Sequence, residues 1–280
     1  MSRVVLITGC SSGIGRASAT AFAATGSKVY ATARQLGTLE GLGDTIVKRS
    51  LDVVDDESMR AVVDEIVTRH GAVDVLVNNA GYGLQAPIET AAIDDVRRQF
   101  ETNVFGLVRL TQLVLPGMRS QSAGRIINLS SMAGRFTFPG GGFYHATKHA
   151  VEAISDALRL EVASFGIRVS VIEPGPVLTD FATTAVSTIG DGDTAPGSFG
   201  PYGDFMNRVA VAYAGAYAGD LSRLASSADD VAQVIVKAAT ARRPRPRYVV
   251  GPMARALVSG KRLLSDRAFD ALVKSRYPTP

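Results

Sequence analysis

VVLITGCSSGIG, residues 4–15, is the stretch that decides the fold. Its first five residues, VVLIT, are apolar or β-branched, as expected of a short parallel strand that is buried on both faces. The turn GCSSGIG follows, and the alanine-rich RASATAFAATG (16–26) has helical composition and ends on Gly26. Glycines let a backbone come close to a pyrophosphate, to which a helix N-terminus offers free N–H groups. The stretch therefore predicts a strand, a phosphate-binding turn and a helix, with a plain tight turn as the alternative.

The same alternation of strand and helix continues along the chain. Strand-like runs lie at 28–34, 46–53, 72–81, 125–130, 167–180 and 247–252. Helical patterns lie at 55–71, 102–118, 145–166, 227–241 and 257–277. Strands that alternate with helices are typical of a parallel sheet covered on both sides. We expect an α/β fold: a Rossmann-like, doubly wound, parallel seven-stranded sheet with helices on both faces.

The length and composition of the chain exclude several classes of protein. With 280 residues, of which 46% are hydrophobic, the chain can bury one large core, and we expect a single domain over residues 1–280. Its 30 basic residues are interleaved with 26 acidic ones, so the net charge of +4 does not indicate nucleic-acid binding. The single cysteine, Cys10, excludes an intramolecular disulfide. No apolar run reaches the ~18–20 residues of a membrane helix, and no signal peptide is visible, so we expect a cytoplasmic protein without a transmembrane segment.

Three segments in the last part of the chain differ from the rest. Residues 181–225 are rich in Gly, Ser, Thr and Ala, and we expect them to form a substrate loop or lid, with a disordered excursion as the alternative. The basic tract ARRPRPR (241–247) is interpreted as a solvated turn. Residues 252–280 are expected to form a C-terminal helical extension.

Tyr144 and Lys148 are the strongest candidates for chemistry. Four residues separate them within a helical pattern, which places both side chains on one helical face. A free phenol has a pKa of about 10, and a neighbouring ammonium lowers it by stabilising the phenolate. Ser131 lies thirteen residues before Tyr144, and the glycine-rich loop between them could fold it back against the phenol. The expected constellation is a hydroxyl, a phenol and an ammonium around one polar atom of a substrate.

The residues at the end of the second predicted strand indicate which cofactor is preferred. An acidic residue there would bind the 2′-hydroxyl of an adenosine ribose. This chain instead has Ala33 and Arg34, and the guanidinium of Arg34 suits a 2′-phosphate. The alternative is an ordinary surface arginine. We therefore expect NADP(H) to be preferred over NAD(H).

The motifs together resemble the short-chain dehydrogenase/reductase family, in its single-domain YxxxK branch. They are TGCSSGIG (8–15), LDV (51–53), NNAG (78–81), NVFG (103–106), NLSS (128–131), YHATK (144–148) and PGPVLTD (174–180), in family order. The likeness is strong over residues 3–180 and looser beyond. Within the family, the chain is most similar to NADP-linked hydroxysteroid and retinol dehydrogenase-like members.

The resemblance implies a role for each matching residue. Tyr144 would be the acid/base, Lys148 its pKa modulator and ribose anchor, and Ser131, preferred over Ser130, the orienter of the carbonyl. Asn103 would hold a proton-relay water. Without the resemblance, an asparagine at this position is also consistent with a helix cap. The implied cofactor contacts, besides Arg34, Tyr144 and Lys148, are Gly9, Ser12, Gly13, Ile14, Gly15, Asp52, Val53, Asn79 and Val177.

The implied activity is NADP(H)-dependent interconversion of a primary or secondary alcohol and its aldehyde or ketone. The implied assembly is a homodimer or homotetramer, and the substrate is expected to be a small apolar alcohol or ketone. Three alternatives stay open: a non-redox epimerase or dehydratase on the same scaffold, a cofactor-binding regulator, and a zinc enzyme that uses His145 and His149. The zinc reading is weak because no HEXXH motif is present, and no metal is expected.

Overall fold

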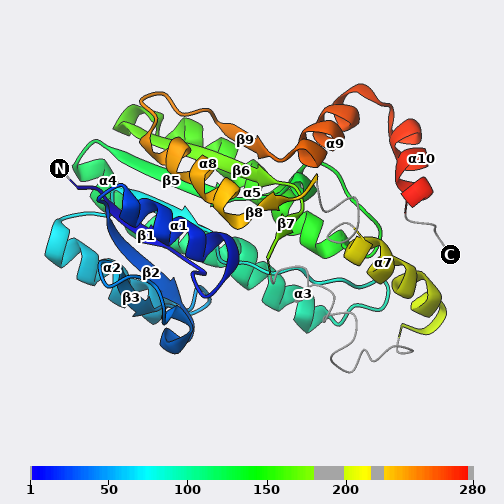
Figure 1. The fold of residues 1–280 in the computed structure, drawn as a ribbon, viewed down its shortest axis with the longest axis horizontal. Coiled ribbons are helices and arrows are strands. Elements are labelled where there is room, and N and C mark those ends of the chain that lie inside the picture. Colours follow the sequence, from blue (N-terminus) through cyan, green and yellow to red (C-terminus); the bar gives the residue numbers. More distant parts are fainter. Residues whose placement is uncertain (1, 180–198, 216–223, 277–280) are drawn as a thin grey trace.

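A seven-stranded parallel sheet forms the centre of the molecule (Figure 1). In this computed structural model, the structure describes residues 2–179, 199–215 and 224–276. The strands, in spatial order, are β3 (Val47–Ser50), β2 (Lys28–Ala33), β1 (Val4–Ile7), β4 (Val75–Asn78), β5 (Gly124–Leu129), β6 (Ile167–Pro174) and β9 (Arg247–Val250). The strand order reverses between β1 and β4, which is where open α/β sheets bind ligands. The predicted doubly wound sheet is confirmed.

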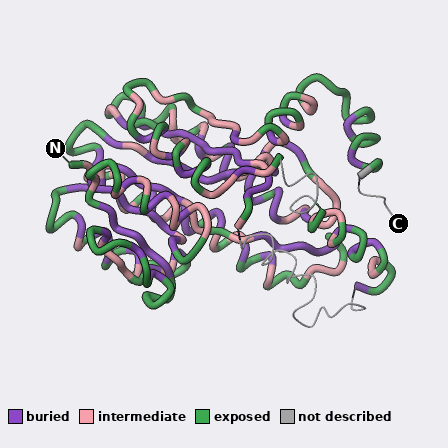
Figure 2. The backbone as a smooth tube through the Cα atoms, viewed as in Figure 1, coloured by how far each residue is buried: buried purple, intermediate pink, exposed green. Residues whose placement is uncertain are grey.

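Helices cover both faces of this sheet. The helices α1 (Gly13–Ala24) and α8 (Ala228–Thr240) pack on one face. The opposite face carries α2 (Asp56–His70), α4 (Gly106–Ser120) and α5 (Gly142–Glu161). Figure 2 shows the buried core running along the strands between these layers, and all four residues of β1 are buried. The apolar VVLI run is therefore the strand buried on both faces that its composition predicts.

One long helix departs from the sequence-based expectation. The helical pattern predicts a start at residue 102, but α3 (Ile93–Phe100) precedes it and continues through a π-helical turn, η2 (Glu101–Phe105), into α4. The first two turns contain only two buried residues, Val96 and Gln99, so an apolar pattern had little to detect. Asn103 consequently lies in the middle of a helix, and the interpretation as an N-terminal cap is wrong.

The remaining elements surround the carboxyl ends of the strands. Two-residue strands β7 (Val177–Leu178) and β8 (Ser226–Ser227) pair in parallel; such short strands have no period to detect. The C-terminal extension forms two helices, α9 (Pro252–Leu263) and α10 (Asp266–Arg276). Helix α7 (Gly203–Gly215) occupies part of the expected 181–225 lid, of which residues 181–198 and 216–223 lie outside the described residues. The 3₁₀ turns are η1 (Leu36–Leu39), η3 (Met132–Gly134), η4 (Ala163–Phe165) and η5 (Gly200–Tyr202).

Candidate active site

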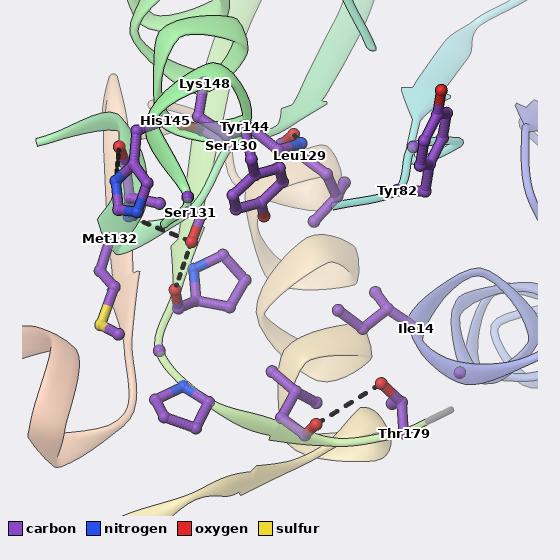
Figure 3. Close-up of a pocket in the computed structure, with 18 of the residues that line it drawn as sticks. Ile14, Tyr82, Leu129, Ser130, Ser131, Met132, Tyr144, His145, Lys148 and Thr179 are labelled. Carbon is purple, nitrogen blue, oxygen red and sulfur yellow. Dashed lines mark hydrogen bonds between the residues drawn. The ribbon is translucent and has the colours of Figure 1, made fainter. Parts of the chain in front are cut away.

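A cavity of about 1370 Å³ opens at the carboxyl ends of the strands (Figure 3). One side is formed by the glycine turn after β1 and by the ends of β2, β4, β5 and β6. The other side is formed by α5 and by residues of α7, α9 and α10. A cavity of this size at the switch point of a parallel sheet is the default ligand site of the fold.

The glycine turn presents backbone to the cavity. Gly9 (φ +70°) and Gly13 (φ +53°) have left-handed backbone conformations, which suit glycine. A Cβ on Gly9 would lie 2.9 Å from the Cα of Ala80, so no side chain fits there. Helix α1 begins at Gly13, and Ser12 before it makes no side-chain capping bond. Free helix N–H groups and the Ser12 hydroxyl therefore face the space where an anion would bind.

Gly15 and Asn79 hold the turn in place. A Cβ on Gly15 would lie 2.2 Å from the carbonyl oxygen of Gly9, and Gly15 does not line the cavity, unlike Gly9, Ser12, Gly13 and Ile14. The absence of a side chain at Gly15 therefore allows close packing of the helix on the turn, and its direct cofactor contact stays a prediction. Asn79 lines the cavity and donates from Nδ2 to the carbonyl oxygens of Thr8 (2.8 Å) and Gly9 (3.0 Å).

The ends of β2 and β3 form the far end of the cavity. Ala33 is buried, whereas Arg34 is exposed, and both line the cavity. The guanidinium of Arg34 makes no hydrogen bond or ion pair with any described residue. Asp52 and Val53 line the cavity beside them, and Asp52 Oδ1 accepts from the backbone N–H of Val54. An uncommitted cation therefore stands beside a small neutral residue at this end.

Tyr144 and Lys148 lie one turn apart on α5 and face the cavity (Figure 3). Lys148 Nζ donates to the carbonyl oxygen of Leu129 (2.8 Å) and lies 5.7 Å from the centroid of the Tyr144 ring. Burial lowers the pKa of Lys148 to about 8, and the carboxylate of Glu152 opposes that shift. The ammonium is thus held behind the phenol by a backbone carbonyl.

Ser131 comes from the end of β5 and caps the turn η3. Its Oγ accepts from the backbone N–H of Ala133 (3.1 Å) and lies 3.4 Å from the carbonyl oxygen of Pro174. Its hydroxyl and that of Tyr144 point into the same part of the cavity in Figure 3. Ser130 also borders the cavity, but its hydroxyl is buried against Gly134. Both this geometry and the thirteen-residue spacing to Tyr144 favour Ser131 over Ser130 as the serine that acts with Tyr144.

Asn103 lies behind the cavity wall. It is buried, its Nδ2 donates to the carbonyl oxygen of Tyr82 (2.8 Å) and to Thr147 Oγ1 (3.2 Å), and its Oδ1 accepts from the backbone N–H of Tyr82. The side chain thus ties the segment after β4 to α5. Of the sequence-predicted residues, Asn103 and Gly15 are the two that do not line the cavity, while Val177 does.

Much of the apolar wall escaped sequence reasoning. Side chains from three helices close the cavity beside Ser131 and Tyr144; among them are Val209, Tyr213, Met253, Leu257, Phe269 and Leu272. The amphipathic pattern at 257–277 marks the helices, but it does not show which part of the sheet they cover. Their packing against Phe136, which contacts Phe269 at a ring-centroid distance of 5.5 Å, provides that information.

A buried pair of glutamates beneath Lys148 also escaped notice. Glu152 is one turn after Lys148 on α5, and Glu173 is in β6; both are buried. Arg247 Nε lies 2.9 Å from Glu152 and 3.2 Å from Glu173. Burial raises the pKa of Glu173 to about 7, and the adjacent Glu152 adds to the shift. A glutamate near the end of the strand-like run RVSVIEP (168–174) was the available signal.

The histidines and the cysteine near the cavity are engaged elsewhere. His145 Nδ1 faces the carbonyl oxygens of Phe136 (2.8 Å) and Ala133 (3.1 Å), and His149 Nδ1 faces that of His145 (2.9 Å). The described residues contain no group of three or more His, Cys, Asp or Glu side chains that could hold a metal ion. Burial raises the pKa of Cys10 to about 12, which does not suit a nucleophile.

Comparison with known proteins is consistent with this geometry. Residues 3–190 match the family model of short chain dehydrogenases. The "Probable short-chain type dehydrogenase/reductase VdlC" of Helicobacter pylori is 34% identical over 272 residues, which are 97% of this chain and 96% of that protein. Human retinol dehydrogenase 8 is 43% identical over 190 residues, covering 64% of this chain and 60% of the relative.

A solved structure extends the likeness to three dimensions. Serine dehydrogenase in its closed form, complexed with NADP+, superposes with a TM-score of 0.73 at 30% identity, covering 89% of this chain and 95% of that one. Within the described parts of the present chain, no helix is both long and apolar enough to cross a membrane.

Proposed function

This chain belongs to the short-chain dehydrogenase family, and from that membership and the cavity we propose that it is an NADP(H)-dependent oxidoreductase. The reaction would interconvert a primary or secondary alcohol and its aldehyde or ketone. The observation that carries the proposal is the meeting of the Tyr144 and Ser131 hydroxyls in one part of the cavity, with the Lys148 ammonium behind the phenol.

The residues present fit a nicotinamide dinucleotide. The glycine turn is a cradle that a Cβ on Gly9 would fill, and it lies in the same cavity as Tyr144. The pyrophosphate would be held by the turn and the N-terminus of α1, and the adenosine by Asp52 and Val53. Asn79 would hold the turn and Val177 would contact the nicotinamide end. When bound, such a cofactor supplies or accepts the hydride.

Two side chains would act on one atom of the substrate, and two others would support them. In reduction, Tyr144 donates its phenolic proton to the carbonyl oxygen, and Ser131 donates a hydrogen bond to the same oxygen. Lys148 stabilises the phenolate that remains, because its ammonium lies close to the ring. Asn103 fixes the segment after β4 against α5 and so keeps the wall in place. General acid catalysis of this kind contributes roughly 10²–10⁴-fold.

The apolar wall supports an apolar substrate. Leu257, Phe269 and Leu272 lie on the side of the cavity formed by α9 and α10. They would bury the body of an apolar alcohol or ketone while its oxygen meets Tyr144. The relative named retinol dehydrogenase 8 supports an apolar substrate.

We also propose a cellular setting and an assembly. The chain would act in the cytoplasm as one domain over residues 1–280, in a homodimer or homotetramer. A single buried cysteine suits a reducing compartment.

Replacing Tyr144 tests the proposed function. Tyr144→Phe removes only the proton donor, so turnover of an apolar ketone with NADPH should fall by at least ~10²-fold while NADPH still binds. Tyr202→Phe is the matched control, because that hydroxyl bonds Glu89 and does not line the cavity. Steady-state kinetics and fluorescence titration of NADPH give the two readouts. Turnover of Tyr144→Phe within a few-fold of the parent would contradict the assignment.

A further inference from the structure

Three arginines gather at the end of the sheet opposite the active-site cavity. A second pocket, of about 360 Å³, lies where β6 begins and α5 ends, and Arg159, Arg168 and Arg243 all line it. Arg243 belongs to the basic tract before β9, which the sequence indicated to be a solvated turn. The pocket volume is within the range of sites for small ligands.

The guanidinium groups of this pocket have few partners. The side chains of Arg168 and Arg243 make no hydrogen bond or ion pair with any described residue. Arg159 contacts Asp156 at 3.4 Å, but its Nε is buried and has no hydrogen-bond partner among the described residues. Arg247 shares that same Asp156, which is therefore divided between two cations. The three arginines of the pocket thus have more N–H donors than Asp156, the carboxylate that Arg159 contacts, can accept.

The neighbouring strand adds to this positive charge. Arg125 in β5 is the register partner of Arg168 in β6, so the two side chains lie next to each other. Burial, with Arg3 and Arg168 nearby, lowers the pKa of Arg125. Asp74, the acidic residue beside Arg3, accepts from the backbone of Val4 and from Gln121. Like charges placed opposite each other destabilise a sheet, and an anion in the pocket would relieve that repulsion.

Apolar side chains complete the pocket. Leu160, Pro244 and Pro246 line it together with the arginines. Guanidinium groups bind phosphate oxygens in pairs of parallel hydrogen bonds, and an apolar rim accommodates a carbon chain. We propose that this arginine pocket binds a small phosphate monoester with a short apolar body, at a site separate from the catalytic cavity.

Calorimetric titration of hexyl phosphate into the NADPH-saturated protein at constant ionic strength is the test. Saturation with NADPH fills the phosphate sites of the catalytic cavity. One molecule should bind per chain, with a dissociation constant of about 1 mM or lower. Arg168→Gln combined with Arg243→Gln should weaken binding by at least about tenfold, because each guanidinium supplies a charge-assisted bond. Arg168→Lys, which retains the charge and loses the fork, should weaken binding less.

Arg60→Gln combined with Arg69→Gln is the control, since it removes the same charge from the exposed face of α2. An unchanged melting temperature and NADPH affinity show that each variant is folded. Equal weakening by both pairs, or no uptake of hexyl phosphate by the parent, would overturn the proposal. Uptake of hexyl phosphate together with sedimentation on phosphatidic-acid vesicles would assign the phosphate to a lipid headgroup. Catalytic loss in Tyr144→Phe is independent of all these outcomes.

Discussion

We expect cofactor choice to depend on two residues at the end of β2. Ala33 is small and neutral, so it does not repel a 2′-phosphate, and Arg34 beside it has no partner among the described residues. A charge-assisted hydrogen bond contributes about 1.5–3 kcal/mol, which corresponds to roughly 10- to 150-fold in affinity. We therefore expect kcat/KM to favour NADPH over NADH by at least about tenfold.

Ala33→Asp combined with Arg34→Ala should reverse this preference, because it removes the fork and adds a carboxylate for the ribose. Arg16→Ala is a suitable control, since that guanidinium bonds the backbone of Thr38 and does not line the cavity. Initial rates with both cofactors check the result. Equal use of NADH by the parent would show Arg34 to be an ordinary surface arginine.

We expect Lys148 to set an upper pH limit for the proposed reaction. Its ammonium is present below the lowered pKa of about 8 and is lost as pH rises through that value. Because the ammonium stabilises the phenolate and would anchor the ribose, kcat/KM for NADPH should fall above pH ~8.

Glu152→Gln removes the carboxylate that opposes the lowering of the Lys148 pKa, so the decline in kcat/KM should begin at lower pH. Glu161→Gln, at the exposed end of the same helix, should leave the profile unchanged. Coincident profiles for the parent and Glu152→Gln would contradict this account.

Residue-level reading of the sequence succeeded where a motif is local. The Tyr144–Lys148 spacing and the glycine turn each define their own geometry, because a helix and a tight turn need no distant contact. Gly15 and Asn103 differ: their environment is set by Gly9, Asn79 and Tyr82, which come from other elements. Glu173 was missed for the same reason, since its partners lie on α5 and β9.

At the scale of elements, the ion cluster around Glu173 joins β6, α5 and β9. Glu173 holds its proton up to a pKa of about 7, whereas the unfolded chain releases it near 4.5. The folded state therefore binds more protons between these values, and this contribution to stability is lost as pH rises through about 7. Arg135, at 3.7 Å from Glu173, and Arg247 limit the loss without removing it.

Glu173→Gln should remove this pH dependence. Relative to the parent, the variant should gain up to about 3 kcal/mol in free energy of unfolding between pH 5 and pH 8. Urea unfolding at both pH values measures the difference, with Glu161→Gln as the control. A gap between variant and parent that is the same at pH 5 and pH 8 would show that Glu173 is ionised throughout this range.

Element boundaries show how far local pattern reaches. The central strands, such as β1 and β4, could be predicted because each is a short apolar run closed by polar or glycine residues. The α3 start could not, because only Val96 and Gln99 are buried in that helix and its charged pairs, such as Arg97 with Asp94, lie on the surface. The positions of α7, α9 and α10 depend on tertiary packing against Ala86 and Phe136. A local sequence pattern does not predict such packing.

At the scale of the whole molecule, the two ends of the sheet have different chemistry. The carboxyl ends carry the large cavity with its phenol and ammonium, and the amino ends carry the arginine pocket. One row of ion pairs links the two regions, from Arg159 through Asp156 and Arg247 to Glu152, one turn from Lys148.

Exposed apolar side chains near the ends of α4 and α5 offer a surface for assembly. The helices α4 and α5 lie on the same face of the sheet and leave large apolar side chains uncovered near their ends: Phe105 is 54% exposed and Phe165 is 43% exposed. Burying apolar area stabilises association by about 25 cal/mol per Å², so a second copy packed on these helices is favoured.

We expect light scattering at micromolar concentration to show a dimer or tetramer. Phe105→Arg should shift it to the monomer, since it places a charge in the interface core. Leu263→Arg, at an 86% exposed position on α9, is the control and should not. A monomeric parent, or a Phe105→Arg variant that assembles like the parent, would show that these helices face solvent.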